Sequence, residues 1–356
     1  TTHVSSTTCF MPFNPMKTQS FETILDRYDH LRLGIVGDVC LDRYFEIDPS
    51  RGEISIETGL EVYNIDRVRC QPGAAGTILN NLVALGIPTI HLIGFCGEDA
   101  EGWQLRRALQ TLAGVHIDHF ITTPHRHTFT YTKPLVRHSD RPPEELHRLD
   151  QKNWTSTPRE VSLQIMEAIH KVAPQVDALM VMDQVDHKNT GVMTDEVLKT
   201  LAELQQKNPS LLIMADSRRS LKDYPPMTFK MNAAELGAWV EAPSSISAQN
   251  VERQACDLAR STGHEVYVSM AEHGICMAQA DGQTYRAAAL PVQGPIDVVG
   301  AGDAVTANLV AAKAAGAQPD EVLTLAMKAA SCVIHQLGTT GVATRADLMN
   351  EPRSTG

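Results

Sequence analysis

The stretch DVVGAGDAV, residues 297–305, combines two glycines with an aspartate directly before an apolar run. Gly300 and Gly302 permit a tight turn in which successive N–H groups point into one volume. A helix that begins there adds unpaired N–H groups and the positive end of its dipole, which suits a phosphate. Asp303 adds a carboxylate that could take a proton from a nucleophile attacking that phosphate. A glycine turn with an aspartate as helix cap is the alternative.

Polar residues also gather where other apolar runs end. GDVCLD brings Asp38 and Asp42 to the end of the first predicted strand, and CQPGAAGTILNNLVALG, residues 70–86, is a second small-residue turn opening a helix. Asn232 and Glu235 in KMNAAE are oxygen donors one helical turn apart, which suits water-mediated Mg²⁺ near phosphates. Taken singly, Asp38 is equally explained as a cap and Glu235 as a solvated helix charge.

The elements that must position these residues alternate along the chain. Continuous apolar runs predict strands buried on both faces of a parallel sheet, and helical patterns lie between them. This order predicts an α/β/α sandwich with ligands at the carboxyl ends of the strands. The predicted strands are 32–42, 88–97, 177–183, 211–216 and 265–270. The predicted helices are 77–85, 102–113, 158–172, 190–206, 251–261, 303–316 and 320–338.

Two segments, 43–70 and 117–138, break that alternation. They are rich in Thr, Tyr, Val and Ile with turn residues between, which predicts a small β lid. The segment that follows, 139–154, is predicted to be an irregular surface loop. The resulting division is a tail with a short helix at 1–30, one large α/β domain at 31–350 and a C-terminal tail at 351–356.

Composition limits the class of protein. The 356 residues, 43% hydrophobic and 21% charged, are ordinary for a globular enzyme. A net charge of -11 argues against nucleic acid or an anionic membrane as the main partner. No apolar run has the length of a membrane span. Seven scattered cysteines without a C-x-x-C motif indicate reduced thiols and a cytoplasmic protein.

In this combination the motifs resemble the ribokinase-like (PfkB) carbohydrate kinases, over about residues 31–348. DVVGAGDAV is similar to the late family signature D-T-x-G-A-G-D. PGAAGTILNNLVALG is similar to the early signature, usually P-G-G-A-A-N-V-A-x-N-L-A-x-L-G. Within the family, GDVCLDRY, LHRLD, the run from ADSRRSLKDY to KMNAAEL, and LGTTGV look most like stretches of heptose-phosphate kinases.

The resemblance implies a three-layer α/β/α ribokinase-like sandwich with a mostly parallel central sheet and a small β lid. It also implies ATP-dependent, Mg²⁺-requiring phosphotransfer to a hydroxyl of a sugar or sugar phosphate. Asp303 would be the base that removes the hydroxyl proton. The N–H groups of Gly300, Ala301 and Gly302 would form the anion hole for the transferred phosphoryl group.

Further roles follow from the same resemblance. Asp42 would hold sugar hydroxyls, and Arg51, Arg137 or Arg148 could bind a substrate phosphate. The other residues expected to surround the substrate are Asp38, Gly73 and Thr77. On the nucleotide side, Asn232 and Glu235 would bind Mg²⁺ through water, and the loop with Ser269, Ala271 and Gly274 would contact the nucleotide. Asp297 and Val299 would bind a monovalent cation such as K⁺.

The chain departs from the family pattern at three positions. Ala74 replaces the second glycine of the early signature, Thr77 its usual asparagine, and Ala271 the first glycine of the nucleotide loop. These departures favour an altered sugar pocket, with a heptose or hexose phosphate as the expected acceptor. A nucleoside or other small-sugar kinase and a non-catalytic sugar or nucleotide sensor are the alternatives. The unpaired edges of the predicted lid also predict a homodimer through the lids.

Overall fold

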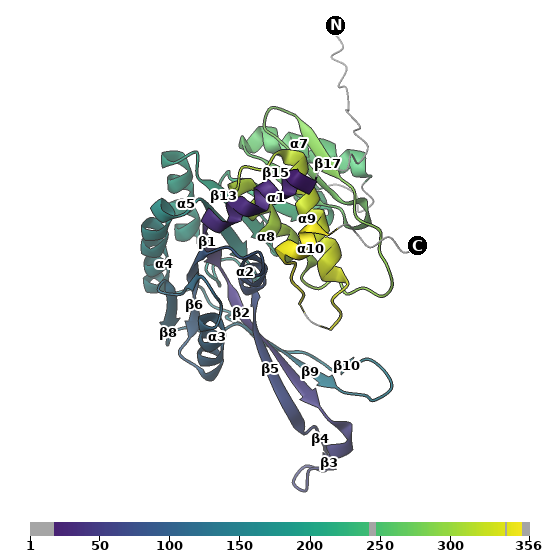
Figure 1. The fold of residues 1–356 in the computed structure, drawn as a ribbon. Helices are drawn as coiled ribbons and strands as arrows, with labels where there is room; N and C mark the ends of the chain where they lie inside the picture. Colours follow the sequence, from purple (N-terminus) through teal and green to yellow (C-terminus); the bar gives the residue numbers. More distant parts are fainter. Residues whose placement is uncertain (1–17, 242–246, 339, 351–356) are drawn as a thin grey trace.

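The computed structural model describes residues 18–241, 247–338 and 340–350 (Figure 1). Its central sheet has the strand order β17-β16-β15-β14-β13-β12-β1-β6-β7, with β8 paired to β6. The strands run parallel except for β16, which pairs antiparallel with both β15 and β17 at one edge. They are β1 (Arg32–Gly37), β6 (Thr89–Gly97), β7 (Val115–His116), β8 (Phe120–Thr123), β12 (Ala178–Asp183), β13 (Leu212–Ser217), β14 (Thr228–Asn232), β15 (Val266–Ser269), β16 (Ile275–Ala278) and β17 (Thr284–Ala287).

Helices cover both faces of this sheet, because its central strands are apolar on both sides. One hydrophobic core includes residues of α1 (Thr18–Arg27), α2 (Ala75–Ala84), α3 (Ala100–Gln110), α8 (Ala301–Ala314), α9 (Pro319–Ile334) and α10 (Arg345–Met349). The other includes residues of α4 (Arg159–Val172), α5 (Asp195–Lys207), α6 (Ala233–Trp239) and α7 (Ala248–Thr262). These layers and the mostly parallel sheet confirm the predicted fold class.

A second sheet forms the lid that extends away from the body (Figure 1). Its strand order is β10-β9-β2-β5, with β11 paired to β9, and a separate hairpin of β3 and β4 follows β2. β2 pairs antiparallel with β5 and parallel with β9. The strands are β2 (Val39–Ile47), β3 (Glu53–Ile54), β4 (Glu61–Val62), β5 (Ile65–Ala74), β9 (Thr130–Val136), β10 (Glu144–Glu145) and β11 (Leu149–Gln151).

The structure corrects three predicted elements. The strand predicted at 32–42 divides at Asp38, so Asp42 lies inside lid strand β2 and not at the end of β1. The predicted lid segment 117–138 also divides, because β8 joins β6 beside the central sheet and only β9 belongs to the lid. The segment 139–154 contributes β10 and β11 to the lid, so it is not wholly irregular. None of the helices in the described ranges has the length and apolar character that a membrane crossing requires.

Candidate active site

The GAGD turn lies at the carboxyl edge of the central sheet, where it starts α8. Gly300 is the N-cap residue with φ 83°, and a Cβ there would come within 2.6 Å of the Thr340 methyl group. The N–H of Ala301 donates to the carbonyl of Val298 at 3.2 Å, so it is already bonded in this structure. The N–H groups of Gly302 and Asp303, in the first helical turn, have no preceding helix carbonyl to bind and point outward from the helix end.

Asp303 is the most perturbed of the residues on this turn. Its residue surface is partly exposed, but its carboxyl group is surrounded by protein. Burial of that group raises the pKa of Asp303 to about 7, and the carboxylates of Asp216 and Asp42 add to this shift. The nearby ammonium of Lys230 opposes it. The structure thus brings together carboxylates from α8, β2 and β13, which are distant in the sequence.

Lys230 and Asp216 form a buried ion pair beneath the turn, and neither was identified from the sequence. Lys230 Nζ lies 2.7 Å from Asp216 Oδ2, and Thr306 Oγ1 donates to the same oxygen at 3.0 Å. A signal was present, because a lysine inside the apolar strand TFKMN requires a charged partner when buried. The partner could not be named without knowing that β13 and β14 are neighbours.

Asp42 faces the turn from the lid. It lies in register with Gln71 on β5 and Tyr131 on β9. A Cβ at Gly73 would overlap the Asp42 carboxylate, so this position requires glycine. Burial raises the pKa of Asp42, and the cations of Lys133 and Arg148 counteract that effect.

Other predicted substrate residues occupy less open positions. The Asp38 carboxylate accepts hydrogen bonds from the N–H groups of Val192 at 2.7 Å and Gln184 at 2.9 Å, so it fixes the bend between β1 and β2. Burial, with the charge of Asp183, raises the pKa of Asp38 to about 7. Thr77 is buried within α2, with 3% of its surface exposed. Neither side chain faces open solvent in this structure.

The three arginines predicted to bind phosphate are all ion-paired within the lid region, Arg137 with Asp66. Arg51 Nη1 lies 2.9 Å from Asp66 Oδ1, and Arg51 Nε lies 3.6 Å from Asp48 Oδ2. Arg148 Nε lies 2.7 Å from Asp150 Oδ1, and its guanidinium lies over the ring of Tyr131. Each arginine would have to exchange a carboxylate for a phosphate in order to bind substrate.

The residues predicted for Mg²⁺ form a capping box at the start of α6. The Glu235 N–H donates to Asn232 Oδ1 at 2.9 Å, and the Asn232 N–H donates to Glu235 Oε2 at 2.7 Å. Burial raises the pKa of Glu235, and the Asp216 carboxylate adds to this. The pair therefore lies within electrostatic reach of the Asp216–Lys230 pair.

The predicted nucleotide loop follows β15. Ser269 Oγ donates to the Met231 carbonyl at 3.5 Å, and a short 3₁₀ turn, η4 (Ala271–His273), comes next. Gly274 has φ 87°, and a Cβ there would overlap the Ala287 carbonyl. Just before the GAGD turn, Asp297 Oδ1 accepts a hydrogen bond from the Val299 N–H at 3.0 Å.

The two alanines that replace family glycines keep a backbone conformation that favours glycine. Ala74 has φ 56° and Ala271 has φ 48°. Non-glycine residues adopt positive φ at a cost of about 1–3 kcal/mol, and such residues cluster at functional sites. The sequence departs from the family's glycine pattern at these positions, but both residues retain the positive φ that favours glycine.

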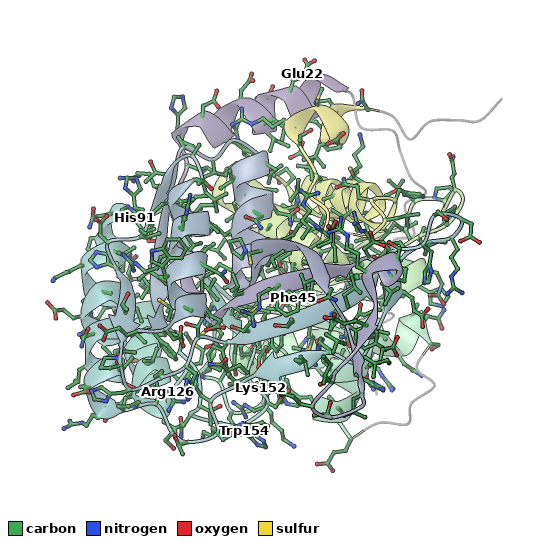
Figure 2. All side chains as sticks on the ribbon, turned by 90° about the horizontal axis from the view of Figure 1, so that it is seen from below. Glu22, Phe45, His91, Arg126, Lys152 and Trp154 are labelled. Carbon is green, nitrogen blue, oxygen red and sulfur yellow. The ribbon has the colours of Figure 1, made fainter. Side chains whose placement is uncertain are left out.

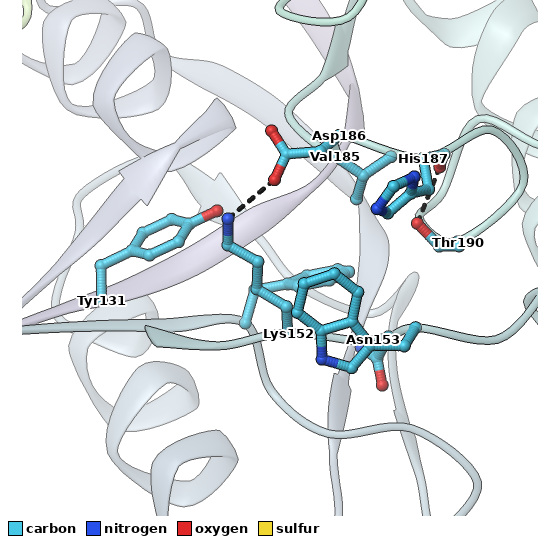
Figure 3. A pocket seen from close by; sticks show the side chains of 9 residues that line it. Tyr131, Lys152, Asn153, Val185, Asp186, His187 and Thr190 are labelled. Atoms are coloured by element: carbon cyan, nitrogen blue, oxygen red, sulfur yellow. Dashed lines mark hydrogen bonds and ion pairs between the residues drawn. The ribbon is translucent and has the colours of Figure 1, made fainter. Parts of the chain in front are cut away.

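A shallow hollow of about 260 Å³ opens beside this site, next to Tyr131 (Figure 3). Lys152 forms an ion pair across it, with Nζ 2.7 Å from Asp186 Oδ2. Trp154 covers its rim and is 69% exposed, and Figure 2 shows Lys152 and Trp154 close together at one edge of the molecule. No motif in the sequence connects these residues.

The fold is a three-layer α/β/α sandwich, and its β lid brings Asp42 to the GAGD turn. Together these features define the class of ribokinase-like proteins. Solved structures support this fold. An Arabidopsis thaliana ribokinase complexed with ribose and ATP matches with a TM-score of 0.66, 19% identity and coverage of 90% of this chain and 97% of that one. Phosphofructokinase-2 from Escherichia coli in complex with potassium matches with a TM-score of 0.68, 17% identity and coverage of 89% and 97%.

The family model described as "pfkB family carbohydrate kinase" matches residues 45–345, so the chain belongs to the pfkB family of carbohydrate kinases. Among curated relatives, the bifunctional protein HldE of Gluconobacter oxydans is 27% identical over 339 residues, which cover 92% of this chain. HldE of Psychromonas ingrahamii is 28% identical over 323 residues, or 90% of this chain. The chain spans 66% and 63% of the lengths of these two relatives.

Proposed function

We propose that this chain transfers the γ-phosphoryl group of ATP to a hydroxyl of a sugar or sugar phosphate, with heptose phosphates as the preferred class. One observation carries the proposal: the Asp303 carboxyl lies at the amino end of α8 and within electrostatic reach of Asp42 on the lid. A proton acceptor is thereby combined with a phosphate-binding helix end and a group that can hold hydroxyls.

Asp303 accepts the proton of the acceptor hydroxyl as that hydroxyl attacks phosphorus. A pKa of about 7 suits this role, because a general base is most effective when its pKa is near the working pH. The unpaired N–H groups of Gly302 and Asp303 at the start of α8 stabilise the charge on the transferred phosphoryl group. The Lys230 ammonium beneath Gly302 contributes to the same positive potential.

Asp42 holds acceptor hydroxyls, and the absent side chain of Gly73 leaves room for the Asp42 carboxylate. On the opposite side, the loop with Ser269, Ala271 and Gly274 lies against the nucleotide. Exposed apolar side chains near the turn suit the faces of an adenine ring. Those side chains are Val298, Val299 and Leu337, exposed at 68%, 49% and 52%.

The residues beside the turn fit a bound Mg²⁺. Asn232 and Glu235 offer amide and carboxylate oxygens at the end of β14, and hard oxygen ligands are those that Mg²⁺ takes. When bound there with ATP, Mg²⁺ would offset the negative charge of the phosphate groups. Asp297 and the Val299 carbonyl supply further oxygens for a monovalent cation such as K⁺.

The assay for this proposal is phosphotransfer from Mg-ATP to a panel of sugars and sugar phosphates by wild type and Asp303→Asn. Loss of the base is expected to lower kcat by about 10²–10⁴-fold with no fall in melting temperature at pH 6. Near-wild-type turnover by Asp303→Asn would contradict the assignment. Binding of nucleotide and sugar without turnover of any acceptor by the wild type would instead favour the sensor alternative.

We also propose a cytoplasmic homodimer that associates through the lids. The lid hairpin exposes apolar side chains, with Ile54, Ile56 and Leu60 exposed at 63%, 102% and 68%. A second copy would remove these side chains from water. Six cysteines in the described ranges are free, which fits a reducing compartment. A monomeric mass in light scattering at micromolar concentration would contradict the dimer.

A further inference from the structure

One face of the lid sheet continues the candidate site away from the GAGD turn. Tyr44, two residues beyond Asp42 on β2, lies in register with Lys133 on β9 and with Arg69 on β5. Residues in register on adjacent strands share a face, and so do alternate residues along one strand. Asp42, Tyr44, Lys133 and Arg69 therefore lie on the same face.

Arg69 and Arg137 in this part of the lid are paired with carboxylates, whereas Lys133 is not. Arg69 pairs with Glu46, and Arg137 with Asp66. Within the described ranges, no carboxylate oxygen forms an ion pair with Lys133. Its ammonium lies 5.3 Å from the centre of the Tyr44 ring.

The position of Lys133 matches the far end of a substrate held at Asp42. Two residues along a strand span about 7 Å, so the Tyr44–Lys133 pair lies about that far beyond Asp42. Asp303 lies on the other side of Asp42, because β2 runs from the central sheet toward the lid hairpin. A sugar with its acceptor hydroxyl at Asp303 and another hydroxyl at Asp42 would extend its remaining carbons toward Lys133.

We propose that Lys133 binds the phosphate of a phosphorylated sugar and sets the preference of this site for sugar phosphates over free sugars. The proposal rests on the phosphotransfer function proposed above. A half-buried ammonium without a carboxylate can accept a phosphate with no existing ion pair to break, and lysine is a common point-charge ligand for phosphate. Lys133 also acts on the charge of Asp42, so the experiment must separate the two effects.

The experiment measures kcat and KM with Mg-ATP and two matched acceptor pairs: fructose 6-phosphate with fructose, and sedoheptulose 7-phosphate with sedoheptulose. Lys133→Met is expected to raise KM for the phosphorylated member by about 10- to 100-fold, the effect of losing one hydrogen bond to a charged group. KM for the free sugar and kcat for both are expected to stay within about threefold. Lys133→Arg, which keeps the charge, is expected to restore most of the affinity.

Arg67→Met is the matched control. Arg67 is exposed, lies in register with Glu46 farther along the same face, and has no ion pair among the described residues. The Arg67→Met substitution removes one positive charge, as Lys133→Met does, but leaves the proposed phosphate position intact. It is therefore expected to leave KM unchanged for the phosphorylated and the free sugars.

Three results would overturn the proposal while phosphotransfer stands. Equal losses for phosphorylated and free sugars in Lys133→Met would mean that Lys133 acts through Asp42. Equal effects of Arg67→Met and Lys133→Met would mean that overall charge alone matters. Wild-type turnover of free sugars only would mean that no phosphate is recognised. Absence of turnover with all four acceptors would overturn the proposed function together with this inference.

Discussion

Lys230 lies 2.7 Å from the Asp216 carboxylate, and less than a tenth of either side chain is exposed. Thr306 hydrogen-bonds to the same carboxylate oxygen and also lies 3.0 Å from the carbonyl oxygen of Gly302. The ion pair thereby connects the ends of β13 and β14 to the first turn of α8. The turn that carries Asp303 rests on a buried charge pair.

Lys230→Met is expected to destabilise the fold by about 3–5 kcal/mol, because it leaves Asp216 buried without a countercharge. Urea unfolding checks this value. The double variant Lys230→Met/Asp216→Asn is expected to recover a large part of the loss, since no uncompensated charge then remains. Equal stabilities of the single and double variants would show that the charge pair is not the cause.

The wild-type pH–rate profile is expected to follow Asp303. A base with a pKa of about 7 is increasingly protonated below that pH, so kcat/KM falls about tenfold per pH unit there and levels off above it. Initial rates between pH 5.5 and 8.5 at subsaturating acceptor measure this dependence. A rate that stays constant down to pH 5.5 would exclude Asp303 as the titrating base.

The same shift predicts that Asp303 costs stability at high pH. Its pKa is about 3.8 in the unfolded chain and about 7 in the folded one, so the folded state binds the proton more tightly. The stability that Asp303 contributes is fully present below its unfolded-state pKa of about 3.8, and it is lost as the pH rises through its folded-state pKa of about 7. Asp303→Asn is therefore expected to raise the melting temperature most at pH 7 and above, and progressively less as the pH falls toward 4. Asp140→Asn, at an exposed loop position, is the control and is expected to leave the melting temperature unchanged.

Ala74→Gly is expected to stabilise the protein by about 1 kcal/mol. Relief of the positive φ of Ala74 is expected to gain about 1–3 kcal/mol of stability. The greater entropy of glycine in the unfolded chain cancels about 0.5–1 kcal/mol of that gain. Ala75→Gly is the neighbouring control, because Ala75 starts α2 without a positive φ. It is expected to destabilise by about 0.5–1 kcal/mol. Destabilisation by both changes would mean that Ala74 is not strained.

The parts of the fold that could be predicted are those encoded by local patterns. Continuous apolar runs indicated five strands of the central sheet, and the glycines of GAGD indicated a turn before α8. Each signal lies within about ten residues, so it can be recognised without knowing the tertiary contacts. β16 and β17 were missed because they form an antiparallel edge, outside the alternation of strand and helix.

The rest depends on which distant segments meet. The break between β1 and β2 is fixed by hydrogen bonds from Gln184 and Val192 to Asp38, about 150 residues apart in the chain. The partner of Lys230 is set by the pairing of β13 with β14. The arginines expected to bind phosphate were chosen by residue type, and only their contacts reveal that they are already paired.

The single residue between β1 and β2 also has a mechanical consequence. Asp38 is 1% exposed and held by two backbone N–H groups, whereas the nine residues of β2 extend outward from it. With a rise of about 3.4 Å per residue, a rotation of about 10° at Asp38 would move Asp42 by about 2 Å and Ile47 by about 5 Å. A ligand that turned β2 about Asp38 on binding to Asp42 would therefore move Ile47 more than twice as far as Asp42.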